Sequence, residues 1–109
     1  MPGPSNKPVP ALESHTEQRV VTWAKHHGIT GLKLNLQGNR GWPDRLFLLH
    51  NGKPVFMEFK RVGASPTLLQ QYNINYLKER GYICEVIHSA AQGIACLARH
   101  LNGNHATAR

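Results

Sequence analysis

The Asn51-Gly52 dipeptide is the feature that most constrains the fold of this chain, because both residues tolerate the positive φ angles of tight hairpin turns. Two strand-like runs flank it, "DRLFLLH" at residues 44–50 and "PVFMEFK" at residues 54–60. The sequence therefore predicts an antiparallel hairpin that brings the two ends of this segment together.

The segments around the hairpin alternate between helical and strand-like periodicity. In chain order, the predicted elements are a helix at 14–27, strands at 32–36, 44–50 and 54–60, a helix at 66–80, a strand at 82–88 and a final helix that starts after Ser89. The alternation in "LKLNL" predicts that Leu32, Leu34 and Leu36 face inward. Ser65 followed by Pro66 predicts an N-cap for the second helix. The order predicts an α/β fold in which helices pack against a mixed sheet.

A chain of 109 residues has room for one hydrophobic core. We expect a disordered leader at residues 1–11, a single domain at 12–103 and a tail at 104–109. No apolar run approaches the roughly 18 residues of a membrane span, so we expect a soluble protein without a membrane partner. Cys84 and Cys96 lack a CxxC spacing, which favours buried, reduced thiols over a disulfide or a zinc site.

The charge balance points to a polyanionic partner. Thirteen Lys and Arg stand against six Asp and Glu, a formal net charge of +7, and nucleic acid is the usual partner of such a surface. The alternative is charge that serves only solubility. Candidate phosphate contacts are Arg40, Arg45, Lys53, Arg61 and Lys78. Trp42 either stacks on a base or packs within the protein.

Three charged residues converge if the hairpin has a suitable register. Glu58 and Lys60 are two apart on a strand and therefore share one face. A three-residue connection at 51–53 would place Asp44 opposite Lys60, whereas a two-residue connection would turn it away. Asp44 follows a glycine and a proline at a strand start, where bulges are common, and this favours the convergent register.

Convergence of the two carboxylates requires positive charge between them. Carboxylates roughly 5 Å apart repel by about 3 kcal/mol at an effective dielectric constant of about 20. Lys60 can supply the positive charge, and so can Mg²⁺ or Mn²⁺, which prefer oxygen ligands. Such a group suits phosphodiester hydrolysis, with Lys60 orienting a water or neutralising charge. The alternative is an ordinary surface hairpin in which Glu58 and Lys60 are solvated neighbours.

The motif "GWPD" at 41–44, followed across the hairpin by "EFK" at 58–60, resembles the PD-(D/E)XK nuclease signature. More narrowly, it resembles the VRR-NUC family, which includes stand-alone phage and bacterial proteins and the nuclease domain of a eukaryotic DNA crosslink-repair enzyme. The approach "NLQGNRGWPD" supports the likeness, which runs from about residue 13 to residue 86. It implies a restriction-endonuclease-like αβββαβ core with a mixed central sheet flanked by helices, plus a C-terminal helix.

The resemblance implies roles for the residues of the two motifs. Asp44 and Glu58 would bind the metal, with the main-chain carbonyl of Phe59 as a third ligand. Lys60 would be the catalytic lysine. We identify no partner at metal-ligand spacing for any of the seven histidines, so no catalytic histidine is assigned.

Two further residues of the family pattern have competing explanations. Glu17 would bind the metal directly or through water, but Ser14 and Glu17 also fit a capping box at a helix start. Gln70 would support the metal site or the lysine from the second helix. Its neighbour Gln71 could take that place, and either could be a solvated helix residue.

The family implies a Mg²⁺- or Mn²⁺-dependent endonuclease of structured or branched DNA. Small members are homodimers that can cut Holliday junctions, and a symmetric cut needs two active sites. Such a protein would act in the cytoplasm of a bacterium or a phage-infected host cell. The alternatives are a nuclease for flaps, duplex DNA or RNA, and a catalytically weak DNA-binding module on the same fold.

Overall fold

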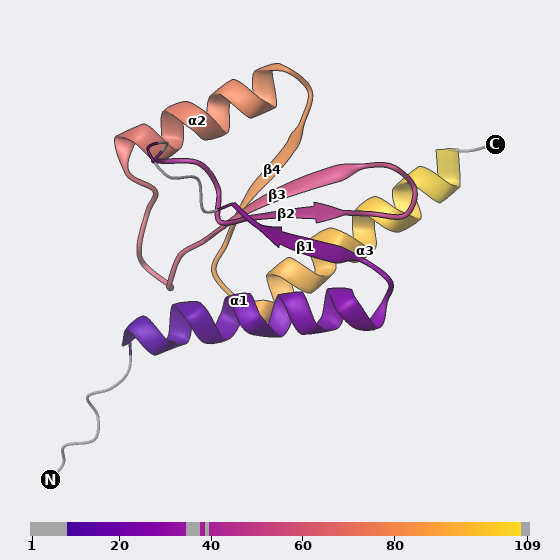
Figure 1. The fold of residues 1–109 in the computed structure, drawn as a ribbon, viewed down its shortest axis with the longest axis horizontal. Coiled ribbons are helices and arrows are strands. Elements are labelled where there is room, and N and C mark those ends of the chain that lie inside the picture. Colours follow the sequence, from indigo (N-terminus) through magenta and orange to yellow (C-terminus); the bar gives the residue numbers. More distant parts are fainter. Residues whose placement is uncertain (1–8, 35–37, 39, 108–109) are drawn as a thin grey trace, which may run out of the picture.

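The structure is a computed structural model that describes residues 9–34, 38 and 40–107, and Figure 1 shows its arrangement. The described elements are α1 (Val9–His26), β1 (Thr30–Lys33), β2 (Arg45–Leu48), β3 (Pro54–Phe59), α2 (Leu68–Glu79), β4 (Ile83–Ile87) and α3 (Ala90–Thr107). This is the predicted αβββαβ order with a C-terminal helix. The predicted α/β fold class is confirmed.

The sheet is mixed and carries a helix layer on each side. Its strand order is β1-β2-β3-β4, in which only β3 and β4 run parallel among the described strands. Helices α1 and α3 lie on one side and α2 lies on the other (Figure 1). The α1/α3 side buries the larger cluster, which includes Val20, Ala24, Phe47, Val55, Met57, Phe59, Ile87, Cys96 and Leu97. The α2 side buries Ile74, Leu77 and Cys84.

The two cysteines lie in different cores, as these clusters show. Cys84 lies in the α2-side cluster and Cys96 in the α1/α3-side cluster, and both are buried free thiols. The prediction of buried, reduced cysteines is confirmed. None of the helices in the described part of the chain combines the length and the apolar character that a membrane crossing requires.

The hairpin between β2 and β3 turns at the predicted Asn-Gly dipeptide. The Gly52 N–H donates to the Leu49 carbonyl at 2.9 Å, and the Leu49 N–H donates to the Lys53 carbonyl at 3.1 Å. Gly52 has a φ of +91°, which glycine adopts without a steric penalty. The loop therefore consists of residues 50–52 and begins one residue earlier than predicted.

The position of this loop moves the strand register by two residues. Arg45 pairs with Met57, and the same register carried one residue further places Asp44 opposite Glu58 rather than opposite Lys60. The predicted register was wrong. Because a shift of two residues keeps each side chain on its own face of the sheet, Asp44 and Glu58 still share a face.

Helix α1 begins at Val9, five residues before the predicted start at residue 14. Pro10 lies in its first turn, where a missing N–H leaves no intrahelical hydrogen bond unmade. Ser14 is therefore an interior helix residue, and the capping-box explanation of Glu17 is wrong. Helix α3 extends to Thr107, beyond the predicted boundary at residue 103. Residues 1–8, 108 and 109 of the predicted leader and tail lie outside the described residues.

Strand β1 differs from its prediction in both position and orientation. It spans Thr30–Lys33, and Leu32 is 43% exposed rather than buried. β1 is an edge strand, and α2, the helix on the side that Leu32 faces, packs mainly against β4 at the other edge. Leu34 is half-buried, and Leu36 lies outside the described residues. The prediction that Leu32 is buried was therefore wrong, because none of the described helices covers this residue.

Candidate active site

Asp44 lies immediately before β2 and is fixed to the end of β3. Its Oδ2 accepts a hydrogen bond from the Phe59 N–H at 2.8 Å. Burial raises the pKa of Asp44 above its ordinary value, and the negative charge of Glu17 adds to that rise. The Phe59 hydrogen bond and the positive charge of Lys60 oppose it. The main-chain hydrogen bond and the Lys60 charge therefore do not fully offset the effect of burial on the Asp44 carboxylate.

The glycine of "GWPD" lets the Asp44 loop approach α2. Gly41 has a φ of +85°, and a Cβ there would lie 2.5 Å from Leu69 Cγ and 2.8 Å from Asn73 Nδ2. The Asn73 side chain also donates to the Arg40 carbonyl at 3.3 Å. Any side chain at residue 41 would push the loop away from α2 and displace Asp44 with it.

Glu58 is the buried acidic residue of the site, only 2% exposed. Its Oε2 accepts a hydrogen bond from Gln70 Nε2 at 2.9 Å and lies 3.4 Å from Lys60 Nζ. Its Oε1 is buried and has no hydrogen-bond partner among the described residues. Burial, followed by the negative charge of Asp44, raises the pKa of Glu58 to about 7, although Lys60 opposes the rise. Glu58 therefore needs more positive charge than Lys60 provides.

Gln70 joins the start of α2 to Glu58. The N-cap of α2 is Thr67, and the Thr67 N–H donates to Gln70 Oε1 at 2.8 Å while the Gln70 N–H donates to Thr67 Oγ1 at 3.2 Å. This capping box replaces the predicted start at Ser65, which was wrong. The other end of the Gln70 amide contacts Glu58. Gln71 instead donates to the Pro66 carbonyl at 2.9 Å.

Glu17 projects from α1 and is neutralised by Arg45. Arg45 Nε donates to Glu17 Oε2 at 2.6 Å, and Arg45 Nη1 donates to the Gly31 carbonyl at 2.9 Å. Lys33 Nζ lies 3.9 Å from the same Glu17 oxygen. The Arg45 side chain is only 14% exposed. Arg45 was predicted as a phosphate contact, but its guanidinium is occupied within the protein.

Glu13 is a site residue that the sequence interpretation missed. Its negative charge raises the pKa of both Asp44 and Glu58, so it lies near them. Glu13 and Glu17 are four residues apart in α1 and therefore share one side of the helix. This spacing was the available signal, but the predicted helix start at residue 14 left Glu13 outside the helix.

Only some of the basic residues predicted to contact phosphates lie near the site. Lys60 is held at its place by its main-chain N–H, which donates to the Ile87 carbonyl at 2.9 Å. Arg61 and Arg40 are exposed and flank the site motifs in the chain. Lys53 lies at the opposite end of the hairpin from Asp44, and Lys78 lies in the last turn of α2. These two do not adjoin the site.

Trp42 lies beside Asp44 in the chain but is used in packing. Its ring makes an edge contact with Tyr76, with centroids 5.9 Å apart, and it packs against the α2-side cluster. The side chain is half-buried. Of the two alternatives for Trp42, the structure shows the packing contact.

The acidic residues of the site differ in the partners that the protein gives them. Glu17 has Arg45, whereas Glu58 has one unpartnered oxygen in the described structure and Asp44 has a main-chain hydrogen bond. Within the described ranges, the three-residue group with metal-ligand spacing is Glu85, Cys96 and His100, and it includes none of Glu17, Asp44 and Glu58. Burial raises the pKa of both Asp44 and Glu58, so these two carboxylates are the ones that the protein stabilises least in their charged form.

Among curated proteins, this chain is similar to one from a phage. "Putative nuclease p44" of Acyrthosiphon pisum secondary endosymbiont phage 1 is 40% identical over 58 residues, which are 53% of this chain and 62% of that protein. The chain thus spans less than two thirds of the length of this relative. No model of a known protein family matches the chain.

Solved structures share the fold over most of the chain. A "VRR_NUC domain" structure superposes with a TM-score of 0.73 at 26% identity and covers 82% of this chain and 96% of its own. A "VRR_NUC domain protein" has a TM-score of 0.64 at 17% identity, with 84% and 88% covered, and shows the common fold. The resemblance seen in the "GWPD" and "EFK" motifs thus extends to the whole fold, which this chain shares with VRR-NUC domain structures.

Proposed function

We propose that this protein is a divalent-metal-dependent DNA endonuclease that hydrolyses phosphodiester bonds beside Asp44, Glu58 and Lys60. The observation that carries the proposal is the state of Glu58. A carboxylate that is 2% exposed, has an unpartnered Oε1 among the described residues and has a pKa raised to about 7 is poorly stabilised by the protein alone. A bound cation would correct this deficit.

The residues present fit Mg²⁺ or Mn²⁺, both of which prefer oxygen ligands. Asp44, Glu58 and the main-chain carbonyl of Phe59 would hold the ion. Glu17 would act through a water molecule, because Arg45 already holds its carboxylate. When bound, a divalent ion supplies Lewis-acid stabilisation of phosphate charge and a water of lowered pKa.

The protein side chains around this place have separate tasks. Lys60 Nζ lies 3.4 Å from Glu58 Oε2, and its side chain is 18% exposed, so it can orient the attacking water or neutralise charge in the transition state. Gln70 fixes the orientation of Glu58 through its 2.9 Å hydrogen bond. Arg40 and Arg61 are exposed cations beside the site motifs that can contact neighbouring phosphates.

The proposed substrate is branched DNA, cut as a Holliday junction by a homodimer. The VRR-NUC fold supports a nuclease, and the formal charge of +7 supports a nucleic-acid substrate. On the α2 side of the sheet, Leu32, Leu48 and Tyr82 are exposed by 43%, 44% and 46%, and a second subunit could cover these apolar side chains. The phage relative supports action in the cytoplasm of a bacterial host cell.

The first experiment is cleavage of an end-labelled four-way junction with Mg²⁺ or Mn²⁺, beside linear duplex, single-stranded, flap and RNA controls. We expect paired symmetric nicks in the junction and a solution mass of two chains by light scattering. If only one of the control nucleic acids were cut, that nucleic acid, rather than the four-way junction, would be the substrate. An absence of metal-dependent cleavage on every substrate would refute the nuclease proposal.

The second candidate function, a DNA-binding module without useful activity, is separated by metal binding. The unpartnered Glu58 Oε1 favours the nuclease, because a module that only binds DNA has no need of a metal ligand. Isothermal titration with Mn²⁺ is expected to show binding to the wild-type protein and its loss in Asp44→Asn. Equal Mn²⁺ binding by both proteins would remove Asp44 from the proposed ligand set.

Gln70→Ala is expected to reduce both stability and cleavage. The variant loses one partner of the capping box, which should lower the free energy of unfolding by about 1 kcal/mol. It also removes the hydrogen bond from Gln70 to Glu58 Oε2, and losing such support for a metal ligand typically lowers activity roughly 10- to 100-fold. Gln71→Ala is the matched control, because the Gln71 side chain donates to the Pro66 carbonyl rather than to Glu58. Equal cleavage by both variants would contradict the positioning role of Gln70.

A further inference from the structure

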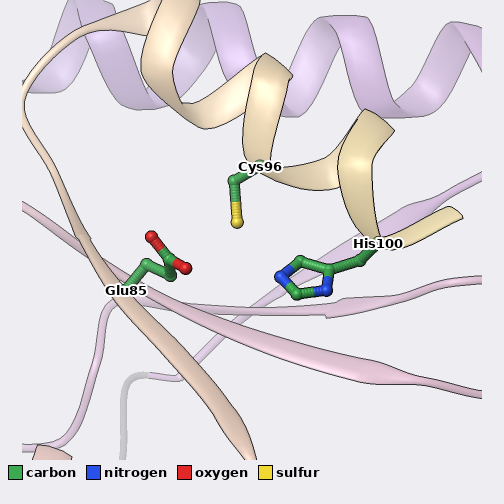
Figure 2. A group of neighbouring side chains, drawn as sticks. All are labelled: Glu85, Cys96 and His100. Atoms are coloured by element: carbon green, nitrogen blue, oxygen red, sulfur yellow. The ribbon is translucent and has the colours of Figure 1, made fainter. Parts of the chain in front are cut away.

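A second group of potential metal ligands lies between β4 and α3, and Figure 2 shows its three side chains pointing toward one another. Glu85 comes from β4, and Cys96 and His100 come from α3. One potential ligand atom from each residue lies within 4.8 Å of the other two. Cys96 and His100 are four residues apart and therefore share one side of the helix.

This group is separate from the nuclease site. Glu85 pairs with Met57, whose side chain belongs to the α1/α3 core, so Glu85 faces the α1/α3 side of the sheet. Glu58 is the next residue of β3 and faces α2, where Gln70 contacts it. The two groups therefore lie on opposite faces of one sheet.

His100 has a buried ring nitrogen that the protein leaves unsatisfied. His100 Nε2 is buried, and the described part of the chain offers it no hydrogen-bond partner. In Figure 2, the ring edge that carries this nitrogen faces Glu85 and Cys96. A buried polar atom without a partner is unusual in a folded protein, and a metal ion among these side chains would satisfy it.

We propose that Glu85, Cys96 and His100 form a second metal site, which takes Zn²⁺ or a divalent ion of similar softness. A thiolate, an imidazole and a carboxylate are the three common protein ligands of Zn²⁺, and a water molecule completes a tetrahedral site. Mg²⁺ and Mn²⁺ prefer sites made of oxygen ligands. The two sites on the protein would thus select different metals.

The site is reachable, and its existing contacts can be displaced. His100 lines a surface pocket together with Lys53 and Arg80, and the Glu85 side chain is 35% exposed, so two of the three ligands can be approached from solvent. Arg99 Nη2 lies 3.3 Å from Glu85 Oε2, but this ion pair is solvent-exposed and so contributes little. The Cys96 thiol must release its proton on binding, which a strongly thiophilic ion can cause and Mg²⁺ cannot.

A metal at this position would connect α3 directly to the sheet. Helix α3 packs mainly against α1, and its contacts with β4 are fewer. Ligands from both α3 and β4 would fix the helix to the strand in a way that hydrophobic contacts alone do not. The expected role is therefore structural, to hold the C-terminal helix, and it does not depend on the proposed nuclease function.

The test uses the full chain, stripped of metal with a chelator and then titrated with Co²⁺ as a spectroscopic substitute for Zn²⁺. We expect one equivalent of Co²⁺ to produce a thiolate-to-cobalt charge-transfer band, which carboxylates at the nuclease site cannot produce. The band should disappear in Cys96→Ser and persist in Cys84→Ser, the matched control with the other buried thiol. Zn²⁺ should raise the melting temperature of the wild type and Cys84→Ser but not of Cys96→Ser.

Two results would overturn the second metal site. One is the absence of a charge-transfer band in the wild-type protein, and the other is an unchanged band in Cys96→Ser. If Cys96→Ser does not fold, His100→Ala tests the second metal site instead. This variant keeps the thiol, and alanine is well tolerated in a helix. Co²⁺ affinity at least tenfold lower in His100→Ala supports the site, and unchanged affinity overturns it. Because absorption is measured, a failure of DNA cleavage would not affect the outcome.

Discussion

Lys60→Ala is expected to lower the rate of metal-dependent DNA cleavage by about 10³-fold and to leave DNA affinity within a few-fold of wild type. Lys60 Nζ lies 3.4 Å from Glu58 Oε2, and its side chain is 18% exposed. It therefore contributes one local charge at the proposed reaction centre but only a small part of the basic surface. Single-turnover cleavage and equilibrium DNA binding without Mg²⁺ measure the two effects separately.

Arg61→Ala is the matched control for Lys60→Ala. Arg61 is the next residue in the chain, carries the same charge and is exposed. Loss of one phosphate contact should weaken DNA binding and reduce its salt dependence by about one counterion while the cleavage rate of bound DNA is maintained. A Lys60→Ala protein that cuts at the wild-type rate, or that loses affinity as Arg61→Ala does without losing rate, would refute the catalytic role.

Glu58→Gln is expected to stabilise the metal-free protein by about 3 kcal/mol above pH 7 while abolishing cleavage. The pKa of Glu58 rises from 4.5 to about 7 on folding, first because of burial and second because of the Asp44 charge. The folded state thus binds a proton more tightly than the unfolded state. The free energy of unfolding therefore falls as pH rises from 4.5 through 7, and the uncharged glutamine avoids this loss.

Thermal melting at two pH values tests this prediction. At pH 8, Glu58→Gln should melt on the order of 10 °C above wild type for a domain of this size. At pH 5 the folded wild type is protonated at Glu58, so the difference should shrink to about 1 kcal/mol or less. Mg²⁺ should stabilise only the wild type and narrow the gap at pH 8. A variant that melts at or below the wild-type temperature at pH 8 would contradict the strained state of Glu58.

The hairpin shows what local sequence could and could not determine. Asn51 and Gly52 predicted the turn, because positive φ is a property of those residues themselves. The register required knowing that residue 50 belongs to the loop, which depends on hydrogen bonds between Leu49 and Lys53. The predicted convergence of Asp44 and Glu58 was robust, because a two-residue error leaves both on the same face.

The periodicity of the strands could not predict which part of the sheet a helix covers. Leu32 alternates with polar neighbours as a buried residue would, yet it is 43% exposed, because no pattern within a strand says which part of the sheet a helix covers. The start of α2 was different, since Thr67 and Gln70 form a readable capping box. We predicted the helix start from Ser65 and Pro66, but the capping box of Thr67 and Gln70 was the stronger signal.

The acidic residues of α1 illustrate how one wrong boundary hides a residue. Glu17 was recognised from the family pattern, and Glu13 became visible only when α1 proved to begin at Val9. The ion pair between Glu17 and Arg45 joins residues 28 apart in sequence, and no local pattern predicts it. Cys96 and His100 had a readable four-residue spacing, but Glu85 joins them only through the packing of α3 on the sheet.

The shared use of Gln70 has a consequence for the local unfolding of this protein. One end of its amide completes the first turn of α2, and the other end orients Glu58. Helix ends are the parts of a helix that open most readily, well below the free energy of global unfolding. Each such opening at Thr67 would also remove the hydrogen bond that orients Glu58, which then keeps only its ion pair with Lys60. We therefore expect amide exchange in this one helical turn to report how often Glu58 loses its fixed orientation.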